Sequence, residues 1–290
     1  MTVSASDVAK LRSMTGAGMM DCKKALDEAE GDMEKAGELL RKKGIIKAAK
    51  RTDKIAAEGT TRVKIDGNDA VVLEINSETD FVAENADFKN LVTEVVDACL
   101  ENEPADMEVA LAQNVGGQVL QERLNNLAAT IGEKISFRRF ALVKKDPTDA
   151  FGAYSHLGGK ISVLILLKNS ADEALAADIA MHAAAANPKY VSRDEVPGEM
   201  VAKEKEIYTE QLKQQGKPEA AMEKILVGKL DKFYSEICLL EQPFIKDEEK
   251  TIQKLLGAGV SIARMERFEL GAGIEKEEKD FAAEVEAQLQ

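Results

Sequence analysis

The segment Thr79-Asp80-Phe81-Val82 places an acid beside an aromatic ring. It follows an apolar stretch at residues 70–75 and precedes a helical pattern, so it lies where a strand gives way to a helix. From such a point the Asp80 carboxylate can offer oxygen to a cation, and the Phe81 ring can act as a wedge in a partner. The alternative is that Asp80 caps the next helix and Phe81 packs beneath it.

Signals for covalent catalysis are weak in this chain. Its only histidines are His156 and His182, and a hydrolytic triad needs a serine or cysteine that folding brings close to one of them. His182 lies in an apolar segment, which predicts a hydrogen-bonded histidine in the core. His156 ends a predicted strand, where it either packs or contacts a partner. Glu133 and Asp146 are predicted to be solvated charges, and no carboxylate pair suggests an acid–base couple.

The sequence motifs of common enzyme classes are missing. The chain has no GxxxxGK[ST] loop to cradle phosphates, no GxSxG and no HExxH. Cys22, Cys99 and Cys238 lie far apart without a CxxC pair, which argues for a reducing compartment and against structural zinc. The sequence therefore predicts a protein that is not an enzyme and that uses no metal and no cofactor.

The net charge of −13 argues against direct binding of nucleic acid, because phosphate contacts need a dense basic surface. Residues 1–54, here called the head, differ by carrying 12 Lys and Arg against 9 Asp and Glu. A mildly basic head on an acidic body suggests different partner surfaces, although a solvated charged face is the commoner explanation. The apolar runs are far shorter than the ~20 residues that span a bilayer, and the N-terminus has no signal-peptide pattern. We expect a cytoplasmic protein without membrane contact.

The head is predicted to form three short helices with tight glycine turns. Ser4 or Ser6 caps the first helix, which ends at the glycines of residues 16–18. The second helix covers about residues 19–29, and Asp32 caps the third. A fourth helical stretch, about 45–57, links the head to the body.

The body, residues 55–275, repeats one plan. In the first copy, 55–145, a hairpin at 61–75 precedes helices near 85–101 and 107–130 and a strand at 135–143. In the second copy, 146–275, a hairpin at 150–167 precedes a helix at about 172–186 and a late strand at 260–270. The fold class is therefore predicted to be α+β, with a duplicated core of mainly antiparallel sheets.

The second copy contains an insertion at residues 198–236. Two helical patterns surround the turn Gly216-Lys217-Pro218, which predicts an antiparallel helical hairpin. This hairpin either contacts a partner or packs on the core. Residues 276–290 follow as a short C-terminal module.

Two longer segments and several short motifs carry a family resemblance. The longer segments are Leu11–Leu26 and Asn76–Ala83, and the short motifs are Arg138-Arg139, Tyr154-Ser155-His156, Ile179–His182, Gly216-Lys217-Pro218, Gln242-Pro243-Phe244 and Gly271–Lys276. In this order they resemble the bacterial translation elongation factor Ts family over essentially the whole chain. The resemblance implies a ubiquitin-associated-like head at 1–54, the duplicated core, the inserted hairpin and the module at 276–290.

The function that this resemblance implies is guanine-nucleotide exchange on elongation factor Tu, in a 1:1 complex or a higher assembly of it. No covalent bond is made or broken, because such a factor only has to bind the nucleotide-free GTPase more tightly than the loaded one. Asp80 and Phe81 resemble the pair that intrudes into the GTPase domain near the Mg²⁺ site. Thr79 and Val82 are expected to set the shape of this loop.

Further contacts follow from the same resemblance. Arg12, Met19 and Met20 resemble a head surface that contacts the GTPase domain, although one of the two methionines could instead fill the core. His156 resembles a residue implicated at the interface. The alternative function is a ubiquitin-associated-type adaptor without exchange activity, which explains the head but not the loop at 79–82. An enzyme that uses His156 or His182 would need a strongly perturbed histidine in a deep pocket.

Overall fold

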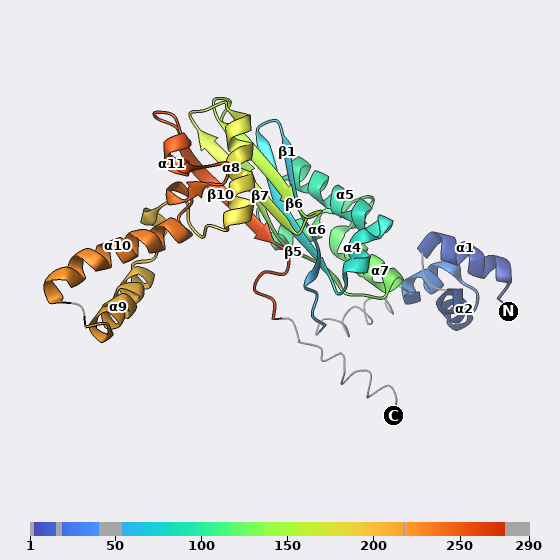
Figure 1. Cartoon of the computed structure of the whole chain (residues 1–290). Coiled ribbons are helices and arrows are strands. Elements are labelled where there is room, and N and C mark those ends of the chain that lie inside the picture. Colours follow the sequence, from blue (N-terminus) through green and yellow to red (C-terminus); the bar gives the residue numbers. More distant parts are fainter. Residues whose placement is uncertain (1–2, 16–18, 41–53, 217, 276–290) are drawn as a thin grey trace. The chain divides into compact units, whose positions relative to one another are not determined.

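The computed structural model describes residues 3–15, 19–40, 54–216 and 218–275 (Figure 1). The chain is α+β with antiparallel sheets, as predicted. Its described residues divide into two compact units. Unit one draws on the described residues within Met1–Arg62, Leu73–Leu142 and Phe268–Gln290, and unit two on those within Val63–Val72 and Val143–Arg267. The domain boundaries near residues 54, 145 and 275 stay predictions, and the module at 276–290 lies outside the described residues.

The head contains α1 (Ala5–Thr15), α2 (Met19–Glu28) and a helical segment at residues 33–40. Ser4 caps α1, since its hydroxyl accepts a hydrogen bond from Asp7 N (3.1 Å). Asp32 begins the third helical segment and accepts from Lys35 N (3.1 Å). The apolar faces of the helices share one small core, made of Val8, Leu11, Cys22, Ala25, Leu26, Ala29 and Ala36. The predicted glycine turn at 16–18 lies outside the described residues.

The predicted linking helix at 45–57 is wrong in its described part, because residues 54–57 are not helical. Ala56 and Ala57 are buried as the chain enters the first strand. Gly271, with φ of 71°, passes so close that a Cβ on it would lie 2.5 Å from the Ala57 carbonyl oxygen. The non-helical backbone at this point permits the close approach of Gly271, a tertiary contact that local helix propensity cannot predict.

The first sheet has the strand order β1-β2-β5. Its strands are β1 (Glu58–Asp66), β2 (Asp69–Ser77) and β5 (Ile135–Lys144). Every residue of β2 from Ala70 to Ser77 is buried, as expected for a central strand that is covered on both faces. The helices of this part are α4 (Asp80–Glu84), α5 (Ala86–Asn102), α6 (Met107–Ala112) and α7 (Leu120–Ile131).

The single helix predicted at 107–130 is interrupted. A small antiparallel hairpin of β3 (Asn114–Val115) and β4 (Gln118–Val119) separates α6 from α7. Its turn is Gly116-Gly117, with φ of 62° and 85°. Two consecutive positive φ angles suit glycine and are incompatible with a right-handed helix, so the helix stops here.

The second sheet repeats the arrangement of the first. Its order is β10-β7-β6, formed by β6 (Ala150–His156), β7 (Ile161–Lys168) and β10 (Ser261–Glu269). In both sheets the second strand of a hairpin is central, and a strand from much later in the copy pairs with its other edge. Helix α8 (Glu173–Ala186) covers the strands β6 and β7 (Figure 1).

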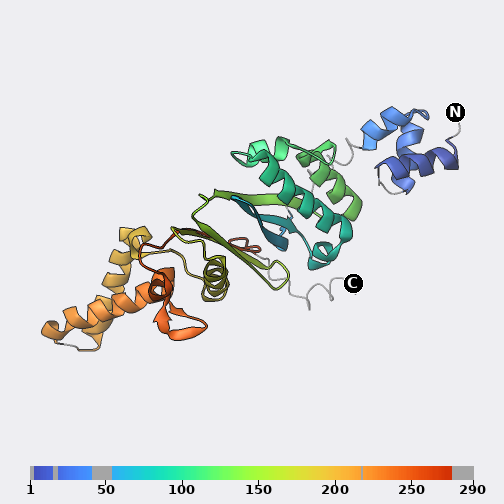
Figure 2. The same cartoon turned by 90° about the horizontal axis from the view of Figure 1, so that it is seen from above.

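The segment at 198–236 contains two helices, α9 (Gly198–Gln214) and α10 (Glu219–Ile237), which lie side by side (Figure 2). Lys229 joins them, since its Nζ lies 4.9 Å from the Tyr208 ring centroid and donates to Gln211 Oε1 (3.3 Å). The remaining short elements of unit two are the 3-10 turns η1 (Arg193–Glu195) and η2 (Leu239–Glu241), the strands β8 (Pro243–Phe244) and β9 (Asp247–Thr251), and α11 (Ile252–Leu255). Within the described ranges, no helix combines the length and apolar character needed to cross a membrane.

Candidate functional site

The loop after β2 presents Asp80 and Phe81 to solvent. Phe81 is 84% exposed, the largest exposed fraction among the large apolar side chains that the structure describes. Asp80 is the first residue of α4 and is also exposed. The alternative in which Asp80 caps the helix and Phe81 packs beneath it is therefore wrong, because Thr79 occupies the N-cap position and Phe81 has no core around it.

Thr79 is anchored by a carboxylate that lies 54 residues further along the chain. Glu133 accepts from Thr79 N through Oε2 (2.9 Å) and from the Thr79 hydroxyl through Oε1 (2.7 Å). In return, Glu78 Oε1 accepts from Lys134 N (2.6 Å). Ser77 adds a local bond from its hydroxyl to Thr79 O (2.8 Å). The prediction that Glu133 is a solvated charge is thus wrong, since its carboxylate binds the loop.

The far end of α4 is anchored by apolar burial and by the next helix. Val82 is 4% exposed, so it points inward from the turn that presents Phe81 outward. Asn85 N donates to Val82 O (3.0 Å), and the Asn85 side chain caps α5 by accepting from Asp87 N (2.8 Å). Both ends of this five-residue helix are therefore attached to the body.

The middle of β2 carries a buried charge cluster. Glu74 is fully buried and accepts from Arg138 (3.0 Å), Arg139 (2.6 Å) and Asn76 (2.9 Å). Gly271 N also donates to it (2.9 Å), which ties the segment after β10 to β2. Burial by itself would raise the pKa of Glu74, but these hydrogen bonds outweigh that effect and hold the pKa below its ordinary value. The Arg138-Arg139 motif therefore has a structural role, because both guanidinium groups pair with the buried carboxylate of Glu74.

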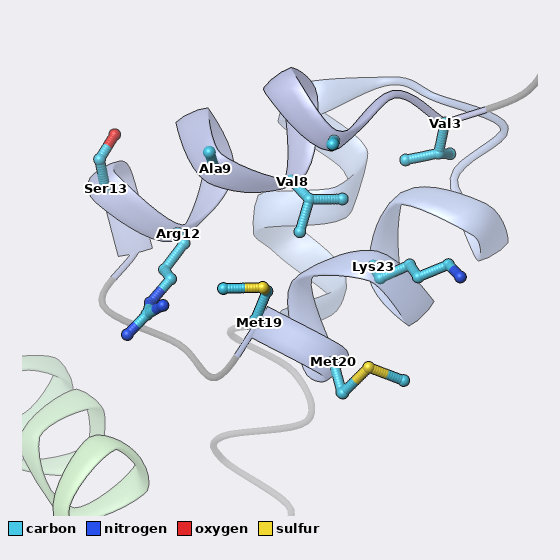
Figure 3. Close-up of a pocket in the computed structure, with 9 residues that line it drawn as sticks. Val3, Val8, Ala9, Arg12, Ser13, Met19, Met20 and Lys23 are labelled. Carbon is cyan, nitrogen blue, oxygen red and sulfur yellow. The ribbon is translucent and has the colours of Figure 1, made fainter.

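The head carries an open groove of about 790 Å³ between α1 and α2 (Figure 3). Arg12, Met19 and Met20 all line it, so the structure brings together the three residues predicted for the head. The two methionines are 56% and 63% exposed, which excludes the alternative that one of them fills the core. The groove is mainly apolar, and Arg12 and Lys23 are the two cations that line it.

Six further groove residues were not predicted: Val3, Ala5, Val8, Ala9, Ser13 and Lys23. Helical spacing could have found several of them. Val8 lies four residues before Arg12, and Lys23 lies four residues after Met19, so each shares a helix face with a predicted residue. Figure 3 shows these side chains together, with Val8 and Arg12 on α1 and Met19 and Lys23 on α2.

Comparison with protein families settles the class of this chain. The family model described as Elongation factor TS matches residues 78–272, which is more than half of the sequence. This chain belongs to the elongation factor Ts family. Membership assigns it to translation elongation, as predicted. The matched range includes the loop at 79–82 and Glu133, whereas the head groove precedes it.

The two histidines of this elongation factor Ts family member lie in different environments. His182 is buried in α8, where Nε2 lies 3.0 Å from Gln242 Oε1 and Nδ1 accepts from Ile245 N (3.3 Å). Burial lowers its pKa, and the bond to Gln242 opposes that shift. The predicted hydrogen-bonded core histidine is therefore confirmed. Both ring nitrogens are engaged within the fold, so neither faces a substrate.

His156 is exposed at the end of β6, and its Nδ1 lies 3.3 Å from the Tyr154 hydroxyl. Packing in the core is thus excluded for it, and the contact with a partner stays a prediction. In the part of the chain that the structure describes, no three His, Cys, Asp or Glu residues gather as a metal site would require.

Proposed function

We propose that this chain binds elongation factor Tu in its GDP-bound form and promotes the release of GDP. The observation that carries the proposal is the exposure of Phe81, held beside Asp80 on a braced loop in a member of the elongation factor Ts family. The chain acts as a guanine-nucleotide exchange factor in the cytoplasm and performs no covalent chemistry. It needs no direct contact with nucleic acid or membrane, and it forms a 1:1 complex or a higher assembly of it.

Exchange follows from unequal affinity for two states of the GTPase. A factor that binds the nucleotide-free state more tightly weakens GDP binding by the same free energy, and returning nucleotide then weakens the grip of the factor. Phe81 supplies such a difference if its ring enters a packed seam only in the nucleotide-free state. Protein interiors resist an inserted ring by moving rigid elements, because they are already close-packed.

The size of the effect indicates that Phe81 does not act alone. Burying one phenyl side chain contributes about 2 kcal/mol, or a factor of about 30 in relative affinity. Shifting a GTPase from a mostly GDP-bound to a mostly nucleotide-free population requires that the factor bind the two states with free energies that differ by about 5.5 kcal/mol. The remainder of this difference is assigned to Asp80, whose carboxylate disturbs the polar network around Mg²⁺.

The head groove and His156 are proposed as further contacts with the GTPase, which strengthen the complex. Arg12, Met19 and Met20 offer an apolar surface with one cation, which suits a helix of the GTPase domain that carries apolar and acidic side chains. Such contacts add affinity for the GTPase in whichever state they bind. They therefore govern how tightly the complex forms, whereas the loop at 79–82 governs how fast GDP leaves.

The deciding experiment measures release of a fluorescent GDP analogue from elongation factor Tu with the wild-type chain and with Phe81→Ala. We expect strong acceleration by the wild type, and slow release with the variant even at concentrations that saturate binding. Val227→Ala is the matched control, since Val227 is an exposed apolar residue on α10. Equal acceleration by the wild type and Phe81→Ala would leave the exchange function standing and refute the wedge.

The alternative function is an adaptor that binds proteins through the head without promoting exchange. The open apolar groove on the head is the observation that favours it. An adaptor predicts no effect of the wild-type chain on GDP release at micromolar concentration. That outcome in the same experiment would overturn the exchange proposal and leave the adaptor.

A further inference from the structure

The helix that carries Phe81 lacks the means to hold its own conformation. α4 has five residues, too few to be stable without external support. Its N-cap residue, Thr79, makes no side-chain hydrogen bond to the helix. Threonine at this position ordinarily accepts a bond from the backbone of the first turn. Here the Thr79 hydroxyl instead donates to Glu133 Oε1 (2.7 Å).

The support comes from a reciprocal clamp between two segments. Glu133 accepts both the N–H and the O–H of Thr79, while Glu78 accepts the N–H of Lys134. Each glutamate therefore satisfies a backbone donor of the other segment. Glu133 follows Gly132, whose φ of 98° ends α7 and turns the chain toward the loop. Hydrogen bonds to a carboxylate are among the stronger ones in proteins.

We infer that Glu133 is a positioning residue for the exchange reaction, acting through Thr79 on Asp80 and Phe81. This inference rests on the proposed function and extends it to a residue outside the loop. With the clamp intact, the direction of Phe81 is set before the partner arrives, so little conformational entropy is lost on binding. Without the clamp, the Thr79 hydroxyl is free to cap α4, and the first turn of that helix loses its fixed orientation.

A first test needs no partner and observes the clamp directly. Amide hydrogen exchange of Thr79 is measured in the wild-type chain, in Glu133→Ala, and in Glu122→Ala. Glu122 is an exposed glutamate on α7, the helix that ends just before Glu133. Its substitution by alanine removes a carboxylate from that helix and leaves the contacts of the loop in place. We expect faster exchange at Thr79 in Glu133→Ala only, with the buried amides of β2 unchanged. Unchanged exchange at Thr79 would overturn the inference whatever the function.

A second test measures GDP release from elongation factor Tu at saturating concentrations of each variant, with binding affinity determined separately. Removing hydrogen bonds to a charged group predicts roughly a tenfold fall in the saturated release rate for Glu133→Ala. Glu133→Gln keeps one acceptor oxygen and should lose less. Because the effect passes through Asp80 and Phe81, adding Glu133→Ala to a variant that carries both Asp80→Ala and Phe81→Ala should slow release by less than about twofold more.

The outcomes separate the inference from the proposed function. If Phe81→Ala slows release but Glu133→Ala does not, the exchange function stands and the positioning role is refuted. If Glu133→Ala slows release as much in the variant without Asp80 and Phe81 as in the wild type, Glu133 acts by its own contact and the inference is wrong. If the wild-type chain leaves GDP release unchanged, the proposed function fails and the positioning role fails with it, while the exchange rate at Thr79 still reports whether the clamp forms.

Discussion

The proposed contacts with the partner are made by exposed apolar side chains. Among the exposed methionines that the structure describes in the head, some line the groove and one does not. Met19 and Met20 line the groove between α1 and α2, whereas Met14, which is 67% exposed, does not. Methionine adapts to irregular partner surfaces because its side chain is flexible and polarizable. Met14 and Met20, which have similar exposed fractions, therefore form a matched pair of positions for testing the groove.

Met20→Lys should weaken binding to elongation factor Tu by a factor of at least about 10, since burial of a methionine contributes about 1.5–3 kcal/mol and the ammonium must also be desolvated. The saturated rate of GDP release should stay close to that of the wild type. Isothermal titration calorimetry and the release assay give the two quantities. Met14→Lys is the control and should bind normally. Equal losses for both variants would show that general charge, and not the groove, decides affinity.

At the scale of elements, α8 packs unusually close to its sheet. A Cβ placed on Gly152 of β6 would overlap backbone atoms of Ala176 and Ala177 in α8. The helix itself is rich in alanine, so small residues on both sides permit the approach. His182 and Gln242 then join α8 to the turn that precedes β8.

Gly152→Ala should lower the free energy of unfolding by about 1–3 kcal/mol, because the added methyl forces α8 away from β6. Gly228→Ala serves as the control in α10, where no atom lies within 4 Å of the new Cβ. That variant should gain about 0.5–1 kcal/mol from the better helix propensity of alanine. Urea unfolding of both proteins measures the difference. A neutral result for Gly152→Ala would mean that α8 adjusts without cost.

The burial of His182 in α8 should also make stability depend on pH. Burial lowers the pKa of His182 below its ordinary value of 6.5, so the folded state binds this proton less readily than the unfolded state. Its contribution is therefore complete above pH 6.5 and is lost as the pH falls through the lowered pKa. Urea unfolding between pH 7.5 and pH 5 should show this loss in the wild type and less of it in His182→Gln. Identical slopes would contradict the assignment.

At the scale of the whole molecule, three buried cysteines report on different parts of the chain. Cys22 lies in the head core, Cys99 in α5 of unit one and Cys238 in unit two. Burial raises the pKa of Cys99 to about 12 and that of Cys238 to about 11. Their thiols therefore react only when the surrounding structure opens.

In variants that keep one cysteine each, Cys22 should react with a thiol reagent fastest under native conditions. The head has a small core, and small cores open at lower free energy. Labelling rates at increasing urea concentration measure the opening of each part. Three equal rates would indicate that the chain opens as one cooperative unit, and the predicted head domain at 1–54 would then lack independence.

Local patterns along the chain were sufficient to predict most of the elements and the fold class. The apolar run of β2, the hairpin of β6 and β7, and the caps at Ser4 and Asp32 each depend on residues close together in sequence. The same patterns failed at Gly116-Gly117, where two positive φ angles divide a helix, and at residues 54–57, where the backbone is not helical and Ala57 closely approaches Gly271. The hydrophobic periodicity of a segment depends on that segment alone, so it cannot predict a contact with residues far away in the sequence.

The candidate sites likewise combine features that the sequence predicted with features that only the tertiary structure decided. The residue types of the loop at 79–82 allowed contact with a partner, and the resemblance to the elongation factor Ts family indicated that contact for the loop and for Arg12, Met19 and Met20 of the head. Only the tertiary structure decided that Phe81, Met19 and Met20 face solvent. It also decided that Arg12 lies in one groove with the two methionines, and that Glu133 binds Thr79. An aromatic residue after a strand suits core and surface equally well, and Glu133 lies 54 residues from its partner. Exposure and pairing depend on what the folded chain places next to each side chain, which residue type alone does not specify.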